Sequence, residues 1–178
     1  MQTYPLADGR TLVLRTPAVT DAENCIAFLC AAGGETDYLL CDENGIPGLT
    51  PEGERTYLSD TLNDPRIGMT LGFVDGKLVT VFDIRPRLRQ RQAHTAIVSL
   101  VVRKPYWHLG IGSAAMRTMV DFARSSGMFK HLHLDVRADN ARAIALYKRF
   151  GFVQCGRLKD AICVHGLYYD QLLMDLEL

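Results

Sequence analysis

The pattern of apolar and polar residues predicts one strand and two helices in the first third of the chain. Residues 11–15 alternate between apolar and polar side chains, which is typical of a strand. Residues 21–31 carry apolar side chains at helical spacing, and the glycines at 33–34 are expected to end this helix. Residues 35–48 are polar and rich in glycine, so they predict a loop. Thr50 then supplies the cap of a second helix.

The second helix is expected to begin with Pro51 and to end near Asp64, because proline suits the first position of a helix. Three strands are predicted after it, over residues 68–74, 77–84 and 93–102. The Asp-Gly pair between the first two of these strands is typical of a tight hairpin turn. This part of the chain therefore predicts neighbouring antiparallel strands.

The last third of the chain predicts two more helices and three more strands. One helix follows Gly112 and one follows Asn140, while strands are expected at 131–136, from Phe152 and from Leu167. Hairpins then surround a single β-α-β unit. This order predicts an α/β protein of the α+β type, with a mixed, mostly antiparallel central sheet flanked by helices. We expect residues 1–178 to form a single domain.

Composition excludes several classes of function. The chain is 48% hydrophobic and 22% charged with zero formal net charge, so we expect no nucleic-acid partner. No apolar run approaches the ~18 residues of a membrane helix, and no signal peptide is recognisable, so we expect no membrane association and a cytoplasmic location. The five cysteines are scattered without a Cys-x-x-Cys pair, which predicts reduced thiols and no metal site.

A glycine-rich loop at Gly110 and Gly112 opens the helix that follows the strand ending at Val102. Unpaired N–H groups at a helix N-terminus attract anions, and glycines let a phosphate approach the backbone. A Walker loop is excluded because no Gly-Lys-Ser or Gly-Lys-Thr follows. A dinucleotide fingerprint is disfavoured because residues 103–109 separate the strand from the first glycine. The chain after this loop is also too short to complete a doubly wound sheet.

Two separated motifs resemble the GNAT superfamily of acyl-CoA-dependent N-acyltransferases. Residues 107–112 resemble its pyrophosphate loop, although Trp107 stands where Gln or Arg is usual. Residues 140–152 resemble its Asn-x-x-Ala-x-x-Leu-Tyr stretch followed by Gly-Phe. The resemblance implies the GNAT fold. It also implies an N-acetyltransferase that moves an acetyl group from acetyl-CoA to a primary amine, by direct attack in a ternary complex.

The resemblance also implies which residues hold the cosubstrate. Backbone groups of Leu100 and Val102 would contact the pantetheine arm, together with Asn140. The pyrophosphate would lie on the N–H groups of six consecutive residues: His108, Leu109, Gly110, Ile111, Gly112 and Ser113. Tyr147 would lie on the same helix face as Asn140 and protonate the departing CoA thiolate as a general acid.

The catalytic base is expected among four residues: Glu35, Asp37, Asp83 and His94. We name Glu35 as the candidate catalytic residue, since it opens the acidic loop that carries Asp42 and Glu43. An acidic loop suits a cationic acceptor, either a small-molecule or a peptide amine. The 3′-phosphate of CoA is expected at one of three cations: Lys104, Arg142 or Lys148.

Several alternatives stay open from the residues alone. A domain of this fold could bind acyl-CoA without turnover, and a covalent route would need an activated thiol such as Cys155. The arginine run over residues 85–91 suits a solvated hairpin tip or a docking patch for an acidic partner. The long C-terminal strand makes a homodimer a further expectation.

Overall fold

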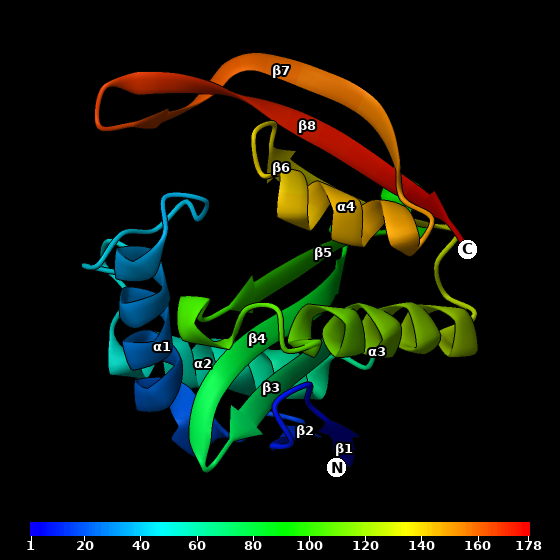
Figure 1. Ribbon diagram of the computed structural model, residues 1–178. Coiled ribbons are helices and arrows are strands. Elements are labelled where there is room, and N and C mark those ends of the chain that lie inside the picture. The colour runs from blue at the N-terminus through cyan, green and yellow to red at the C-terminus, as the bar shows by residue number, and fades with distance from the viewer. The chain divides into compact units, whose positions relative to one another are not determined.

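The computed structural model describes residues 1–178. Its strands are β1 (Gln2–Pro5), β2 (Thr11–Arg15), β3 (Gly68–Val74), β4 (Lys77–Pro86), β5 (Thr95–Val102), β6 (His131–Arg137), β7 (Val153–Val164) and β8 (Leu167–Glu177) (Figure 1). Its α-helices are α1 (Ala22–Glu35), α2 (Pro51–Asn63), α3 (Ile111–Ser126) and α4 (Ala141–Arg149). None of the helices has both the length and the apolar character needed to cross a membrane.

The eight strands follow one another in the order β1-β2-β3-β4-β5-β6-β8-β7. Strand β5 runs parallel to β6, whereas the pairs β1–β2, β2–β3, β6–β8 and β7–β8 are antiparallel. This confirms the predicted mixed, mostly antiparallel sheet. The chain divides into two compact units: unit 1 (Met1–Asp83 and Leu100–Ala115) and unit 2 (Ile84–Ser99 and Met116–Leu178). A single domain over the whole chain stays a prediction.

Unit 1 has its core where α1 and α2 pack on β3. The buried side chains are Ala22 and Cys25 from α1, Leu58 from α2, and Met69 and Leu71 from β3, with Phe73, Leu78 and Val81 packed against them. Apolar residues on one face of each helix thus meet one face of the strand. Burial of this surface is the main force that holds the helices on the sheet.

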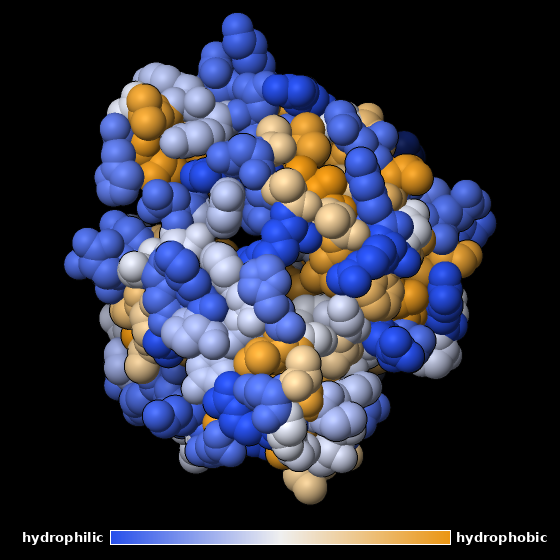
Figure 2. Space-filling view, in the orientation of Figure 1, coloured by the Kyte–Doolittle hydropathy of each residue, from blue (hydrophilic) through white to orange (hydrophobic).

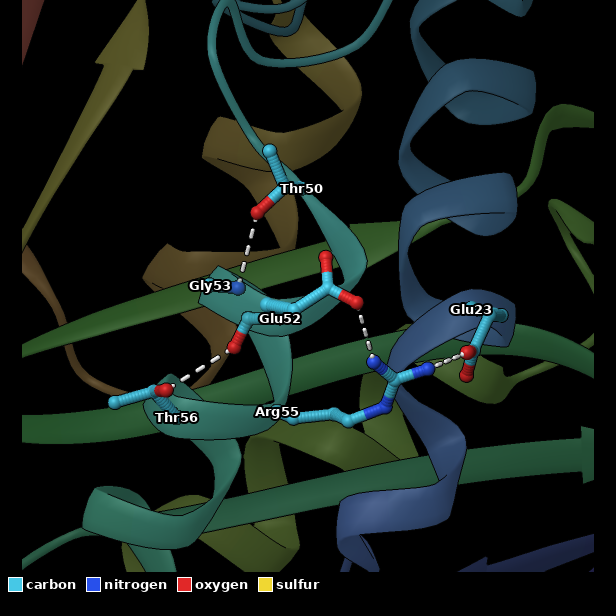
Figure 3. A network of polar contacts seen from close by, with 6 residues as sticks. All are labelled: Glu23, Thr50, Glu52, Gly53, Arg55 and Thr56. Carbon is cyan, nitrogen blue, oxygen red and sulfur yellow. Dashed lines mark hydrogen bonds and ion pairs between the residues drawn. The ribbon is translucent and has the colours of Figure 1, made fainter.

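Polar contacts cap α2 and link it to α1 in unit 1 (Figure 3). The Thr50 hydroxyl accepts a hydrogen bond from the Gly53 N–H at 3.1 Å, which confirms the predicted cap of α2. Arg55 of α2 donates to Glu52 at 3.0 Å and also to Glu23 of α1. Of these contacts only the ion pair between Arg55 and Glu23 joins the two helices, and it lies at their exposed edge.

Unit 2 has its core on one face of β6 and β8. Strand β6 buries every second residue at Leu132, Leu134 and Val136, and β8 pairs with it along the whole length of β6. Strand β7 continues the hairpin with β8, through two irregularities in the register. Figure 2 shows apolar side chains gathered at the end of this hairpin, upper left, where Leu167 is 61% exposed. The predicted homodimer stays a prediction.

Three details of the predicted elements were wrong. Helix α1 does not end at Gly33 and Gly34 but continues to Glu35. A Cβ at Gly33 would lie 2.1 Å from the Asp42 carbonyl oxygen, so this glycine serves close packing rather than helix termination. Strand β5 begins at Thr95 rather than Ala93, and β1 was missed because its four residues are mostly exposed.

The buried thiol of Cys25 is expected to be inert. Burial raises the pKa of Cys25 to about 12, so almost none of it is thiolate at neutral pH. Cys155 and Cys163 are exposed. With a chromogenic disulfide at pH 8, these two thiols should react at least about 100-fold faster than Cys25. Peptide mapping of the labelled thiols checks this, and early labelling of Cys25 would contradict the packing of α1.

Candidate active site

The strand that leads to the glycine loop leaves its parallel neighbour early. Strand β5 pairs with β6 at Thr95, Ala96 and Ile97, and within unit 2 the register does not continue at Val98. The backbone of β5 at Val98 and Ser99 therefore has groups that β6 does not use. Such a divergence of two parallel strands exposes N–H and C=O groups that a ligand amide can pair with.

The loop after β5 is held in a fixed turn. The Trp107 indole Nε1 donates to the Val102 carbonyl oxygen at 2.7 Å, which closes the turn over the short 3₁₀ helix Lys104–Tyr106. This contact accounts for the tryptophan at a position where the superfamily usually has Gln or Arg. It also engages the Val102 carbonyl, so a ligand would depend on the other backbone groups of this strand.

Two residues of the loop take the left-handed backbone conformation. His108 has a φ of 64° and Gly110 a φ of 92°. Glycine adopts this conformation at little cost, whereas a residue with a Cβ is strained by about 1 kcal/mol. A Cβ at Gly110 would meet nothing within 4 Å, so the space beside this backbone is open. The loop therefore turns its backbone toward free space at Gly110.

The turn between β1 and β2 braces this loop within unit 1. The Ala7 N–H donates to the Leu109 carbonyl oxygen at 3.3 Å. The Arg10 guanidinium lies 5.2 Å from the centroid of the Tyr106 ring, a distance that permits a cation–π contact. The N-terminal turn thus holds the loop from the side, as a preorganised anion site requires.

Helix α3 begins at Ile111, directly after the open position at Gly110. The Gly110 carbonyl accepts the Ala114 N–H at 3.0 Å, which is the first hydrogen bond of the helix, so Gly110 occupies the N-cap position. The first N–H groups of a helix point out of its N-terminus together with the positive end of its dipole. This geometry fits the pyrophosphate of CoA, which needs several backbone donors and no side chain in the way.

Asn140 caps α4 in unit 2. Its Oδ1 accepts the Ala143 N–H at 3.2 Å, and the residue is 8% exposed. Because a backbone N–H is a donor, the atom that faces it must be the amide oxygen. The cap does not use the Nδ2 group, which keeps its capacity to donate. Asn140 can serve both as a cap and as a donor to a ligand carbonyl.

Tyr147 is buried in the same helix. Its ring packs against Phe152 with centroids 6.1 Å apart, and only 9% of the residue is exposed. Burial raises the pKa of Tyr147 to about 12, with the Arg142 charge acting weakly in the other direction. No protein group forms a hydrogen bond with its hydroxyl. The phenol is therefore kept protonated and available to donate.

Glu35 is engaged rather than free. Its Oε1 accepts from Arg103 Nε at 2.8 Å and from Nη2 at 2.6 Å, while its Oε2 accepts the Lys104 N–H at 2.8 Å. Burial by itself raises the pKa of Glu35, but these hydrogen bonds outweigh it and bring the pKa below its ordinary value. A carboxylate held charged in this way is a weaker base than a free one. The arrangement favours a structural role over proton transfer: Glu35 ties the end of α1 to Arg103 and Lys104, and we call these contacts the Glu35 tie.

The other candidate bases lie in different surroundings. Asp37 is exposed in the segment after α1, and Asp83 is 8% exposed near the end of β4. His94 is exposed just before β5, where its carbonyl oxygen accepts the Lys130 N–H at 2.7 Å. Asp37 and Asp83 belong to unit 1 and His94 to unit 2. The base therefore stays unassigned.

Comparison with known proteins bears on these features directly. A family model described as the acetyltransferase (GNAT) family matches residues 36–152, which include the glycine loop, Asn140 and Tyr147. The chain belongs to the GNAT family. Its predicted class, an acyl-CoA-dependent N-acyltransferase, is thereby confirmed.

Two relatives are similar to the chain in sequence, and a more distant structure shares its fold. The L-amino acid N-acetyltransferase AaaT of Escherichia coli is 31% identical over 110 residues, which are 62% of this chain and 68% of that enzyme. A GNAT acetyltransferase from Streptococcus pneumoniae of known crystal structure is 30% identical, with a TM-score of 0.89 over 94% of this chain and 99% of that one. The structure of yncA from Salmonella typhimurium, determined with acetyl-CoA, is 15% identical with a TM-score of 0.80 over 93% of each chain. At that identity it shows the fold alone.

Sequence reasoning missed two supports of the site, Arg103 and Ala7. Arg103 had a signal, because Glu35 is the last residue of α1 and the last turn of that helix has no basic residue. A negative charge is unfavourable at a helix C-terminus, so a cation from another part of the chain is expected beside Glu35. Ala7 acts through its backbone N–H, which no pattern of side chains reveals.

Proposed function

We propose that this protein acetylates a primary amine with acetyl-CoA, by direct attack in a ternary complex with Tyr147 as general acid. The observation that carries the proposal is the family match, which spans both the glycine loop and the helix with Asn140 and Tyr147. The loop belongs to unit 1 and the helix to unit 2, and the role proposed for each is given separately.

The donor would be held mainly by backbone groups of unit 1. The N–H groups of residues 108–113 would receive the pyrophosphate, supported by the open space at Gly110. Backbone groups of Leu100 and the N–H of Val102, whose carbonyl is engaged by Trp107, would pair with the pantetheine arm, and the Asn140 amide would add one donor. Acetyl-CoA supplies an activated thioester, and the chain's own residues hold it for attack.

The proton of the departing thiolate would come from Tyr147. CoA thiolate is the conjugate base of a thiol with an ordinary pKa near ~8.5, so it needs a proton at the moment of departure near neutral pH. The raised pKa of Tyr147, about 12, keeps the phenol protonated over the whole working range, and burial would also make the thiolate that receives the proton a stronger base. General acid catalysis of this kind contributes about 10²–10⁴-fold to a rate.

The acceptor would be a free amine bound beside the acidic segment at residues 36–50. An amine with a pKa of ~10.4 must lose a proton before attack, which costs ~4–5 kcal/mol at pH 7. AaaT is named for L-amino acids, so we place amino acids first in the acceptor screen. Glu35 is engaged by Arg103 and Lys104, so another of the candidate bases or ordered water would take the amine proton.

The pH dependence of the reaction tests this proposal. With a saturating thioester, kcat/KM should rise by about tenfold per pH unit below the pKa of the amine, which is ~10.4 for a lysine-like amine and lower for the α-amine of an amino acid. Because Tyr147 titrates near 12, no falling limb should be seen below about pH 10.5. Thiol release from acetyl-CoA across a panel of amines measures both, and acetyl-CoA hydrolysis without amine is the control.

The second candidate is a domain that binds acyl-CoA without turnover. It would bind acetyl-CoA in calorimetry but release no thiol with any amine of the panel. The hydroxyl of the buried Tyr147 favours the enzyme, because a pure binding module has no need of a buried phenol left without a partner.

A further inference from the structure

One carboxylate fastens two segments that the chain keeps far apart. Glu35 and Arg103 are 68 residues apart in sequence, yet Arg103 holds Oε1 at 2.6 and 2.8 Å. The second oxygen, Oε2, accepts the backbone N–H of Lys104 at 2.8 Å. All three residues belong to unit 1. The contact thus joins the end of α1 to the start of the loop that leads to α3.

The pair is partly shielded from water. The side chain of Glu35 is 20% exposed and that of Arg103 is 27% exposed. Burial acts against both charges, but the hydrogen bonds between the two groups prevail, so the pKa of Glu35 is lowered and that of Arg103 is raised. Both groups therefore stay charged throughout the working pH range. A shielded pair with two hydrogen bonds, and a third to the carboxylate from the Lys104 N–H, holds its geometry better than an exposed ion pair.

On the side of α1, the tie fixes the segment that precedes α2. The backbone at Asp42 lies directly on Gly33, and Glu43 lies 3.1 Å from the position of a Cβ on Gly34. Residues 41–43 are thus packed on the last turn of α1, which Glu35 ends. This segment is the acidic one that we expect beside the amine.

On the side of the loop, the tie fixes the entry to the glycine turn. Lys104 begins the 3₁₀ helix that Trp107 closes by its hydrogen bond to Val102. The Leu109 carbonyl, two residues before Ile111, is held by Ala7. Glu35 and Ala7 therefore hold the start and the end of one loop. A shift of Lys104 would move the donors that follow it.

We infer that Glu35 is a positioning residue that couples donor binding to the acceptor segment, and not a base. The inference rests on the proposed function, because it assigns the loop to acetyl-CoA and the acidic segment to the amine. The carboxylate holds the start of the loop, and Glu35 ends the helical turn on which residues 41–43 pack. Loss of its charge would loosen them together, so acetyl-CoA and the amine would both bind more weakly.

The variant Glu35→Gln tests the tie sharply. An amide can accept from Arg103 through its oxygen, but its NH₂ group then faces the Lys104 N–H, and two donors repel. We expect the Kd of acetyl-CoA in calorimetry to rise about tenfold and the KM of the amine about fivefold. The kcat should stay within about threefold, and the shape of the pH profile should not change. Arg103→Gln should have the same effects, and the double variant should add little to either.

The matched control is Glu23→Gln. It removes another carboxylate of α1 and its contact with Arg55, at the opposite end of the helix (Figure 3). Both affinities should stay within about twofold of the original protein. Thermal unfolding is compared for all variants, and Glu35→Asp serves as the milder change if Glu35→Gln fails to fold.

The outcomes separate the inference from the proposed function. If the unmodified protein binds no acetyl-CoA, the proposed function fails. If it binds acetyl-CoA but Glu35→Gln keeps both affinities and kcat, the positioning role is overturned. A kcat about 100-fold lower with both affinities intact would instead make Glu35 the base and overturn the inference.

Discussion

Replacing Tyr147 by phenylalanine is expected to lower kcat by about 10²–10³-fold, with the Kd of acetyl-CoA within about twofold of its original value. The substitution removes one hydroxyl and keeps the ring that packs on Phe152. No protein group hydrogen-bonds that hydroxyl, so its loss leaves no protein donor or acceptor unpaired. The substitution should therefore destabilise only the transition state in which the thiolate departs. Steady-state kinetics measures the loss of kcat, and calorimetry measures the Kd of acetyl-CoA.

Tyr168→Phe is the matched control for this change. Tyr168 is 67% exposed near the start of β8, so its hydroxyl has no task in the proposed reaction. Its kcat should equal that of the original protein. If Tyr147→Phe kept full turnover over the pH range, Tyr147 would not be the general acid. The thiolate would then leave without a proton from the protein.

Gly110→Val is expected to weaken acetyl-CoA binding by at least about 100-fold, which corresponds to about 3 kcal/mol. The φ of 92° at Gly110 is costly for any residue with a Cβ, and most of all for a β-branched one. The new side chain would also fill the open space beside the backbone where we expect the pyrophosphate. Calorimetry with acetyl-CoA measures the loss directly.

Gly127→Val separates the phosphate site from backbone strain. Gly127 follows the last residue of α3 and has a φ of 63°, and a Cβ at this position would also meet nothing within 4 Å. The two variants should lose similar amounts of stability in thermal unfolding, about 1–2 kcal/mol. Only Gly110→Val should lose acetyl-CoA affinity. Equal affinities in the two variants would remove the loop from the site.

Much of the fold could be predicted because local patterns and tertiary structure agree. The Thr50 cap, the Pro51 start of α2 and the alternating burial along β6 are read from short stretches of sequence. The remaining errors concern residues whose role depends on distant partners. The glycines at 33–34 do not terminate α1. Residues 42–43 pack against them and leave no room for a larger side chain, and no local sequence pattern reveals this packing.

The candidate site divides in the same way. The glycine loop and the spacing of Asn140 and Tyr147 could be predicted, because both motifs are continuous in the chain. The role of Glu35 could not, since it depends on Arg103 and Lys104 far along the sequence. An acidic residue beside other acidic residues suggests a base or a substrate wall. Only the hydrogen bonds to Arg103 and Lys104 show that Glu35 instead holds two segments together.

The most direct test of the proposed reaction follows the acetyl group itself. The protein is mixed with acetyl-CoA labelled in its acetyl group, first without and then with an accepted amine, and quenched within one turnover. Direct attack in a ternary complex predicts that the label stays on CoA without the amine and moves to the amine when it is present. Label bound covalently to the protein without the amine, at Cys155 or any other residue, would contradict it.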